Sequence, residues 1–228
     1  MTDIWPISMF PTRDFNWYPD AVTGDGAVAA DGTQRPWQSD GGGKWMCTMT
    51  IDLFTPRAVK LARAMRARME FGNTPVVVPC TETSFAPWPD GVPARQIGFG
   101  NGTLFSTGAG FQVTTIDIRL AASAALRATE LSLDVVYAGA LIGGERFSID
   151  HGTKLRRMYD IMSVVQEDDD TVTVGIWPPL REAVAGGVRL DFDRPGCVMR
   201  MVNHKEIMGA IGLNRFSSLV PVFQEVAI

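Results

Sequence analysis

Histidine and cysteine are scarce in this chain of 228 residues. The two histidines, His151 and His204, and the three cysteines, Cys47, Cys80 and Cys197, are widely spaced and form none of the usual zinc-binding motifs. An odd number of scattered cysteines also argues against a disulfide framework and fits a reducing compartment. The composition therefore favours neither a metal centre nor histidine-dependent catalysis, and we expect no cofactor.

Long apolar runs are missing as well. No stretch approaches the ~18 residues that a membrane-spanning helix needs. Residues 1–6 show neither the basic nor the apolar region of a secretory signal, so we expect synthesis in the cytoplasm and no membrane insertion. A net charge of −4 and a pI near 5.2 argue against nucleic acid as the main partner.

Catalytic motifs are equally sparse. There is no GxSxG element. Ser148, Asp150 and His151 lie close together, but on one strand they would not converge as a catalytic triad does. Residues 168–170 are three aspartates without the spacing of a calcium loop. We therefore expect no enzyme. Because paired carboxylates are recognised only in three dimensions, a cell-wall hydrolase stays open as the weaker alternative.

One strand and one helix stand out. Alternation over residues 45–54 predicts a strand with one buried face, made by Trp45, Cys47, Met49, Ile51 and Leu53. Thr55 then suits a helix N-cap and Pro56 the first helical position. Gly72 is a natural stop, so we predict a helix over about 56–70 whose apolar stripe is Ala58, Leu61, Ala62, Met65 and Met69.

The rest of the chain is typical of short strands. The glycine- and aromatic-rich residues 1–44 predict strands and turns, or an arm. Further strands are predicted at 74–79, 111–120, 129–137, 155–165, 171–176, 188–192, 197–202 and 216–226. The strand at 155–165 carries apolar residues on both sides, which predicts cover on both faces. Many strands and one secure helix indicate an α+β fold that is mainly β.

Charged residues gather in two places. The predicted helix carries Arg57, Lys60, Arg63, Arg66 and Arg68, and a short acidic run holds Glu167, Asp168, Asp169 and Asp170. The simplest interpretation of each is a solvated surface. Their opposite signs also fit a subunit interface, in which the basic helix face of one copy meets the acidic run of a neighbour.

Tryptophans offer three interpretations. Trp5 and Trp17 either fix an irregular segment to the core or anchor a neighbouring subunit, because aromatic residues are enriched at interfaces. Trp37, Trp88 and Trp177 fit core or interface packing, and they are also candidates for stacking on sugars. A carbohydrate-binding module therefore remains an alternative function.

The order of elements resembles that of known phage proteins. The strand from Trp45 runs into the Thr55–Pro56-capped helix and then into the short strand after Pro75, which resembles the core of distal-tail and minor-tail proteins. The later segments 125–133, 143–149, 158–161, 176–184 and 193–201 are similar to the C-terminal half of tail proteins of siphophages and of gene-transfer agents from alphaproteobacteria. The resemblance covers about 45–80 and 121–228, and it is looser elsewhere.

That resemblance implies a virion structural protein without catalytic residues, assembled in the host cytoplasm. It implies a homo-oligomeric ring near the tail tip that joins the tail tube to the hub or fibres, so the expected partners are further copies and other tail proteins. It also implies a β-sandwich-like domain, formed by residues 1–120 with 193–228 and carrying the helix. An inserted small β-barrel-like module would span residues 121–192.

Overall fold

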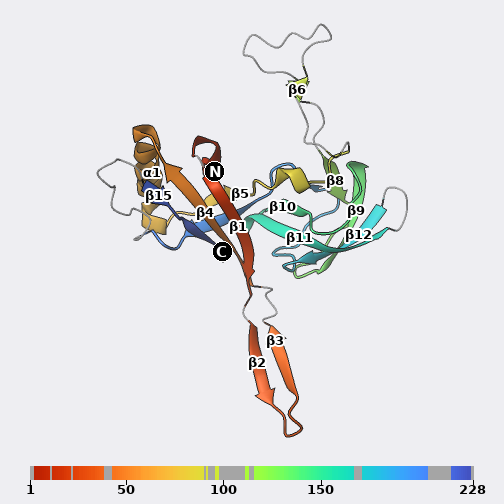
Figure 1. Cartoon of the computed structure of the whole chain (residues 1–228). Coiled ribbons are helices and arrows are strands. Elements are labelled where there is room, and N and C mark those ends of the chain that lie inside the picture. The colour runs from red at the N-terminus through yellow and green to blue at the C-terminus, as the bar shows by residue number, and fades with distance from the viewer. Residues whose placement is uncertain are drawn as a thin grey trace. The chain divides into compact units, whose positions relative to one another are not determined.

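The protein is mainly β, with one α-helix in the part of the chain described by the computed structural model (Figure 1). That part comprises residues 3–10, 12–21, 23–38, 43–89, 91, 96–97, 111–112, 116–166, 171–204 and 217–226. The predicted fold class is confirmed, with one half-barrel sheet and one nearly closed barrel sheet. No helix in these ranges is long and apolar enough to cross a membrane.

The chain forms two compact units. Unit 1 comprises residues 1–80, 152–157 and 196–228, and unit 2 comprises 81–151 and 158–195. The sequence analysis places an inserted module at 121–192, whereas the observed second unit begins at Thr81 and ends at Pro195. The 152–157 segment is thus a short piece of unit 1 that lies in sequence between the two parts of unit 2.

Unit 1 is built on a six-stranded antiparallel sheet. Its strands in spatial order are β1 (Thr12–Asp20), β4 (Lys44–Leu53), β16 (Val222–Glu225), β14 (Gly196–Met201) and β5 (Val76–Pro79), and β15 (Ser217–Leu219) also pairs with β4. The predicted alternation of β4 is confirmed, because its five apolar side chains from Trp45 to Leu53 are at most 1% exposed. Where one strand was predicted over 216–226, Val220 and Pro221 separate β15 from β16, and Pro221 has no N–H to give to a ladder.

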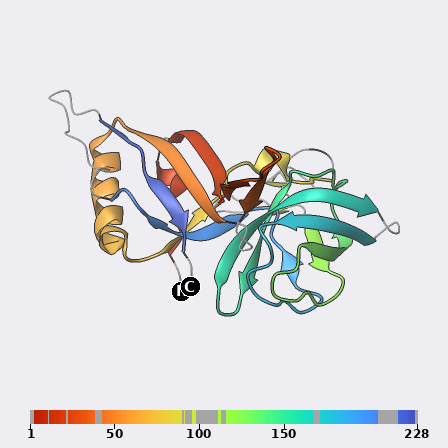
Figure 2. The same cartoon turned by 90° about the horizontal axis from the view of Figure 1, so that it is seen from below.

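The helix α1 (Pro56–Arg68) lies in unit 1 and appears beside its sheet in Figure 2. The Thr55 hydroxyl accepts a hydrogen bond from the Ala58 N–H at 3.1 Å, as the predicted N-cap requires. Ala58, Ala62 and Met65 are buried, so the helix turns a narrow apolar face inward. The helix ends two residues earlier than predicted, and the short 3-10 turn η2 (Glu70–Gly72) follows it.

Unit 2 contains the barrel sheet. Its strands in spatial order are β10 (Arg146–His151), β11 (Leu155–Gln166), β12 (Thr171–Trp177), β9 (Glu130–Tyr137), β8 (Asp117–Leu120) and β13 (Arg189–Leu190). A backbone bridge between Ser148 and Asp191, with N···O distances of 3.0 and 2.9 Å, joins the two ends of this order. The inside is filled by a buried cluster that includes Phe147, Tyr159 and Phe192.

Two strand predictions in unit 2 are corrected. The expected strand over 111–120 is β7 (Phe111–Gln112) and, separately, β8, with residues 113–115 outside the described residues. The prediction that the strand at 155–165 is covered on both faces is correct only for the first half of β11. The pairing of β11 with β12 is irregular between Ile161 and Ser163, and this leaves Met162 59% exposed.

Short elements complete the described part. They are the 3-10 turns η1 (Ile7–Met9) and η3 (Thr83–Phe85), the strand β6 (Gln96–Ile97), which pairs with β7, and the strands β2 (Thr23–Val28) and β3 (Gln34–Gln38). β2 and β3 form a hairpin by themselves.

Candidate interaction surfaces

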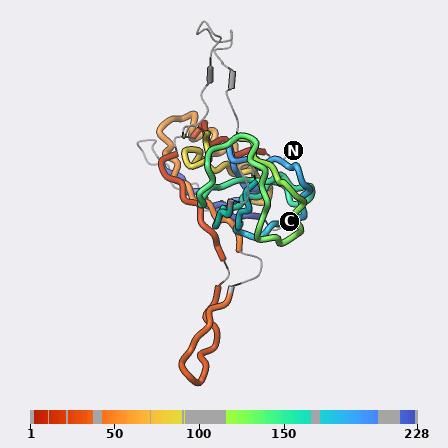
Figure 3. Tube along the Cα trace, turned by 90° about the vertical axis from the view of Figure 1, so that its right-hand side faces the viewer, coloured from red at the N-terminus to blue at the C-terminus, as the bar shows by residue number. Residues whose placement is uncertain are grey.

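The hairpin β2–β3, hereafter the arm, extends away from the six-stranded sheet of unit 1 (Figures 1 and 3). In the chain the arm lies between β1 and β4, and the last pair of the β1–β4 ladder is Asp20 with Lys44. No side chain described between Thr23 and Trp37 is buried. A two-stranded hairpin is marginally stable alone in water, and burial of side chains does not add to the stability of this one.

Close backbone approaches shape the arm. Trp37 lies opposite Gly24, and a Cβ atom at Gly24 would come within 2.8 Å of the indole ring. A Cβ atom at Gly26 would collide with the carbonyl oxygen of Arg35. At the tip, the Asp31 carboxylate accepts hydrogen bonds from the backbone N–H and the hydroxyl of Thr33 at 2.9 and 2.6 Å, which lowers the pKa of Asp31. Gly24, Gly26 and the Asp31–Thr33 turn are therefore residues that the backbone of this hairpin requires.

The tryptophans fall into two groups. Trp5, Trp17 and Trp88 are buried: Trp5 stacks on Phe10 with ring centroids 5.4 Å apart, and the Trp88 indole N–H donates to the Thr83 carbonyl at 2.6 Å. Trp177 is half-buried. Trp37, on the arm, is 53% exposed and is the single large aromatic side chain that the arm presents to solvent.

The cations of α1 are not equivalent. Arg68 pairs with Asp3 through two hydrogen bonds, one of them 2.7 Å long, and Arg66 is half-buried. Arg57, Lys60 and Arg63 are exposed on the side opposite the buried alanines. The predicted acidic partner run, Glu167 to Asp170, lies outside the described residues, which end on one side at Gln166 and resume at Thr171.

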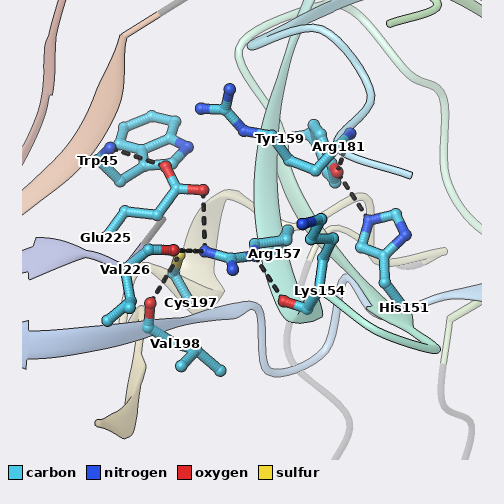
Figure 4. A network of polar contacts seen from close by, with 10 residues as sticks. All are labelled: Trp45, His151, Lys154, Arg157, Tyr159, Arg181, Cys197, Val198, Glu225 and Val226. Atoms are coloured by element: carbon cyan, nitrogen blue, oxygen red, sulfur yellow. Dashed lines mark hydrogen bonds and ion pairs between the residues drawn. The ribbon is translucent and has the colours of Figure 1, made fainter. Parts of the chain in front are cut away.

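A buried ion pair in unit 1 is a feature that the sequence analysis missed (Figure 4). Arg157 Nη1 donates to Glu225 Oε1 at 3.2 Å and to the Val226 carbonyl at 2.6 Å, while its Nε donates to the Lys154 carbonyl at 2.6 Å. The other carboxylate oxygen of Glu225 accepts the backbone N–H of Trp45 at 3.1 Å. One signal was available: Arg157 occupies the same face as Leu155 and Tyr159 in an alternating apolar strand.

The histidine of the rejected triad is part of the interior of unit 2. His151 Nε2 and the Tyr159 hydroxyl share a hydrogen bond of 2.7 Å, and the same hydroxyl accepts the Arg181 backbone N–H at 3.1 Å (Figure 4). All three cysteines are buried. Among the described residues, no group of three histidine, cysteine or acidic side chains is placed to hold a metal ion.

A second charged cluster joins two segments of unit 2. Arg146 lies between two carboxylates, with Nη1 at 2.7 Å from Glu82 and Nε at 3.0 Å from Asp160. Burial raises the pKa of Asp160 above its ordinary value of 3.8, while Arg146 opposes the rise and Glu82 adds to it. Because Arg146 is already bonded to both acids, the cluster serves to tie Glu82 to β10 and β11.

The raised pKa of Asp160 makes a prediction for Asp160→Asn. A carboxyl with a higher pKa in the folded state binds its proton more tightly there, so its contribution to stability declines as pH rises above 3.8. The variant, which cannot ionise, should therefore gain stability relative to wild type as pH rises through this range. Urea unfolding at a series of pH values measures the difference, and an offset that does not change with pH would contradict the prediction. The pKa of Asp193 is also raised by burial, but Asp193 is present in both proteins and its effect cancels.

No protein-family model matches the chain, and no curated protein matches it.

Proposed function

We propose that this protein is a structural subunit of a phage tail, which self-associates into a ring near the tail tip and joins the tail tube to the hub or fibres. The arm is the observation that carries the self-association. The link to tails rests on the resemblance of segments 45–80 and 121–228 to distal-tail and minor-tail proteins. We assign it a structural rather than a catalytic role in the virion.

The arm fits a subunit of an assembly for a physical reason. Its backbone is specified by Gly24 and Gly26, yet it buries none of its described side chains within its own unit. Exposed strand edges are usually shortened or covered, because they invite pairing with other chains. An arm that keeps both edges and an exposed Trp37 gains stability when a neighbouring subunit covers it.

Removing the arm tests this proposal. Replacing residues 21–43 with Asn-Gly should keep β1 and β4 paired, because Asp20 and Lys44 are already opposite each other and a two-residue turn closes such a hairpin. We expect wild type to form oligomers that grow with concentration and the armless variant to stay a folded monomer. Light scattering after size-exclusion chromatography, with circular dichroism for folding, gives both readings.

The control for this experiment is Ile142→Ala, which trims an exposed side chain on unit 2 and should leave assembly unchanged. Electron microscopy of the wild-type oligomer should show rings. A wild-type protein that stays monomeric at every concentration, or an armless variant that assembles as wild type does, would contradict the proposal.

Carbohydrate binding remains a second candidate because of Trp37. Its indole lies over Gly24 and is more than half exposed, and polar residues Thr23 and Gln34 also belong to the arm. A flat aromatic face with a polar margin suits the apolar side of a sugar ring. Glycan-array binding by wild type that Trp37→Ala abolishes would support this alternative, whereas equal signals would dismiss it.

A further inference from the structure

The two strands of the arm differ at their outer edges. Because β2 and β3 form a sheet of two strands, each has one edge that pairs within the hairpin and one that does not. Pro36 on β3 is opposite Asp25 on β2. Proline has no N–H, so its nitrogen in a ladder lies on the side away from the partner strand. The outer edge of β3 therefore lacks a donor at Pro36, whereas β2 contains no proline.

The outer edge of β2 presents backbone groups that can bind a further strand. In an antiparallel pair, opposite residues alternate between those that bond each other and those whose N–H and C=O groups point outward. Asp25, opposite Pro36, is of the second kind, and so is Thr23, two residues earlier in the same ladder. β2 carries neither the lysine nor the proline that commonly protects an edge. This edge is therefore suited to strand addition.

The six-stranded sheet of unit 1 ends in a second open edge. Among the described residues, β1 pairs with β4 alone, and no backbone hydrogen bond reaches its other side. The Met49 N–H donates to the Pro221 carbonyl at 3.2 Å, next to β16. Met49 is thus not bonded to Phe15, its partner on β1, and Phe15 turns its own N–H and C=O outward, as does Trp17 by the same alternation. The opposite end of the sheet is covered, because the segment before η1 already bonds to β5.

An exposed aromatic side chain accompanies each open edge. Trp37 is 53% exposed, and its indole lies close to Gly24 on β2. Tyr18 on β1 is 37% exposed. With β2 added beside β1, Gly24 places no side chain between the two rings, so Trp37 and Tyr18 can cover each other across the new pair of strands.

We propose that β2 of one copy adds to the open edge of β1 in a second copy, so that the sheet of unit 1 gains the arm of its neighbour. Within a single chain these two edges are not paired with each other. The inference rests on the proposed self-association and names the strands that make it. The two edges differ, so the contact is head-to-tail. Such a contact repeats from copy to copy and closes into a ring when the rotation between copies permits.

Asp25→Pro tests the donor on the β2 edge. It removes the outward N–H of residue 25 and, like Pro36, leaves the bonds inside the hairpin in place. The apparent Kd of self-association, measured by sedimentation velocity, should rise by about tenfold or more, because a carbonyl of the partner strand loses its donor and meets the proline ring. Circular dichroism checks that the variant is folded.

Two controls make this result specific. Asp25→Ala removes the same carboxylate but keeps the N–H, and should leave the Kd within about twofold of wild type, since isolated surface charges contribute little. Gln38→Pro removes an outward donor from the β3 edge instead, because Gln38 is opposite Thr23. It should also assemble as wild type does.

Cross-linking identifies the partner strand with the arm and β1 left intact. One chain carries Asp25→Cys and another carries Asn16→Cys; both positions are exposed, and the three native cysteines are buried. A short bismaleimide should join the mixed chains into dimers on a denaturing gel, whereas either chain alone should give few. Cross-links formed mainly between two Asp25→Cys chains would assign the β2 edge to a two-fold contact and overturn the head-to-tail pairing.

The outcomes separate this inference from the proposed function. An Asp25→Pro variant that assembles as wild type does, or mixed chains that do not cross-link, would overturn the strand addition. If the armless variant is monomeric in the same experiments, the proposed function still stands. A monomeric wild type would overturn both.

Discussion

Replacing Arg157 with methionine should destabilise unit 1 by about 3–5 kcal/mol, the usual effect of breaking a buried ion pair from one side. The Arg157 and Glu225 side chains are only 3% and 5% exposed. Without the guanidinium, the Glu225 carboxylate keeps the Trp45 N–H but loses its counter-charge, and the carbonyls of Lys154 and Val226 lose their donor. Urea unfolding, followed by tryptophan fluorescence, measures the loss.

Two further variants show whether the charge is the cause. Adding Glu225→Gln to Arg157→Met should recover part of the loss, because the amide removes the buried charge and still accepts from Trp45. Arg157→Lys should recover little, because one ammonium group cannot reproduce bonds made separately by Nε and Nη1. A loss below about 1 kcal/mol in Arg157→Met, as exposed pairs give, would show that the pair is not desolvated.

The second large effect is expected for Phe147→Ala in unit 2. Phe147 is fully buried, and its ring centroid lies 5.5 Å from that of Tyr159 and 5.2 Å from that of Phe192. Removing a buried phenylalanine ring and leaving a cavity costs about 3–5 kcal/mol. Hydrogen exchange should therefore accelerate in the β10, β11 and β12 amides of unit 2.

Phe85→Ala provides the matched control, because it removes the same side chain from a position in unit 2 that is 71% exposed. Exposed substitutions usually change stability by less than about 0.5 kcal/mol. If the two variants lost similar stability, the Phe147 cluster would not be the centre of the unit 2 core.

Local signals in the sequence were sufficient for the strand and helix around Thr55. The alternation of β4 and the Thr-Pro cap involve residues that are neighbours in the chain, and both predictions are confirmed. The place of β16 between β4 and β14 depends on pairings between distant segments, so no local pattern could give it. The same reason hides the Arg157–Glu225 pair, whose members are 68 residues apart.

The candidate surfaces were predictable to different degrees. Helical periodicity places the α1 cations away from Ala58 and Ala62, and the structure agrees for Arg57, Lys60 and Arg63. It could not show that Arg68 binds Asp3, because that bond depends on where the first residues of the chain lie. The sequence also could not show that Trp37 is exposed and Trp5 is buried. The exposure of a tryptophan depends on which distant strands pack against it.

The central position of β16 also sets an order of events during synthesis. Both parts of unit 2 are made before β14 and β16, although the first 80 residues of unit 1 are made before either. Until β16 is made, the edge of β4 that pairs with β16 lacks this partner. This edge can then bind another unfinished chain. Unit 1 thus starts before unit 2 on the ribosome and is completed after it, and newly made unit 1 depends on the speed with which β16 inserts.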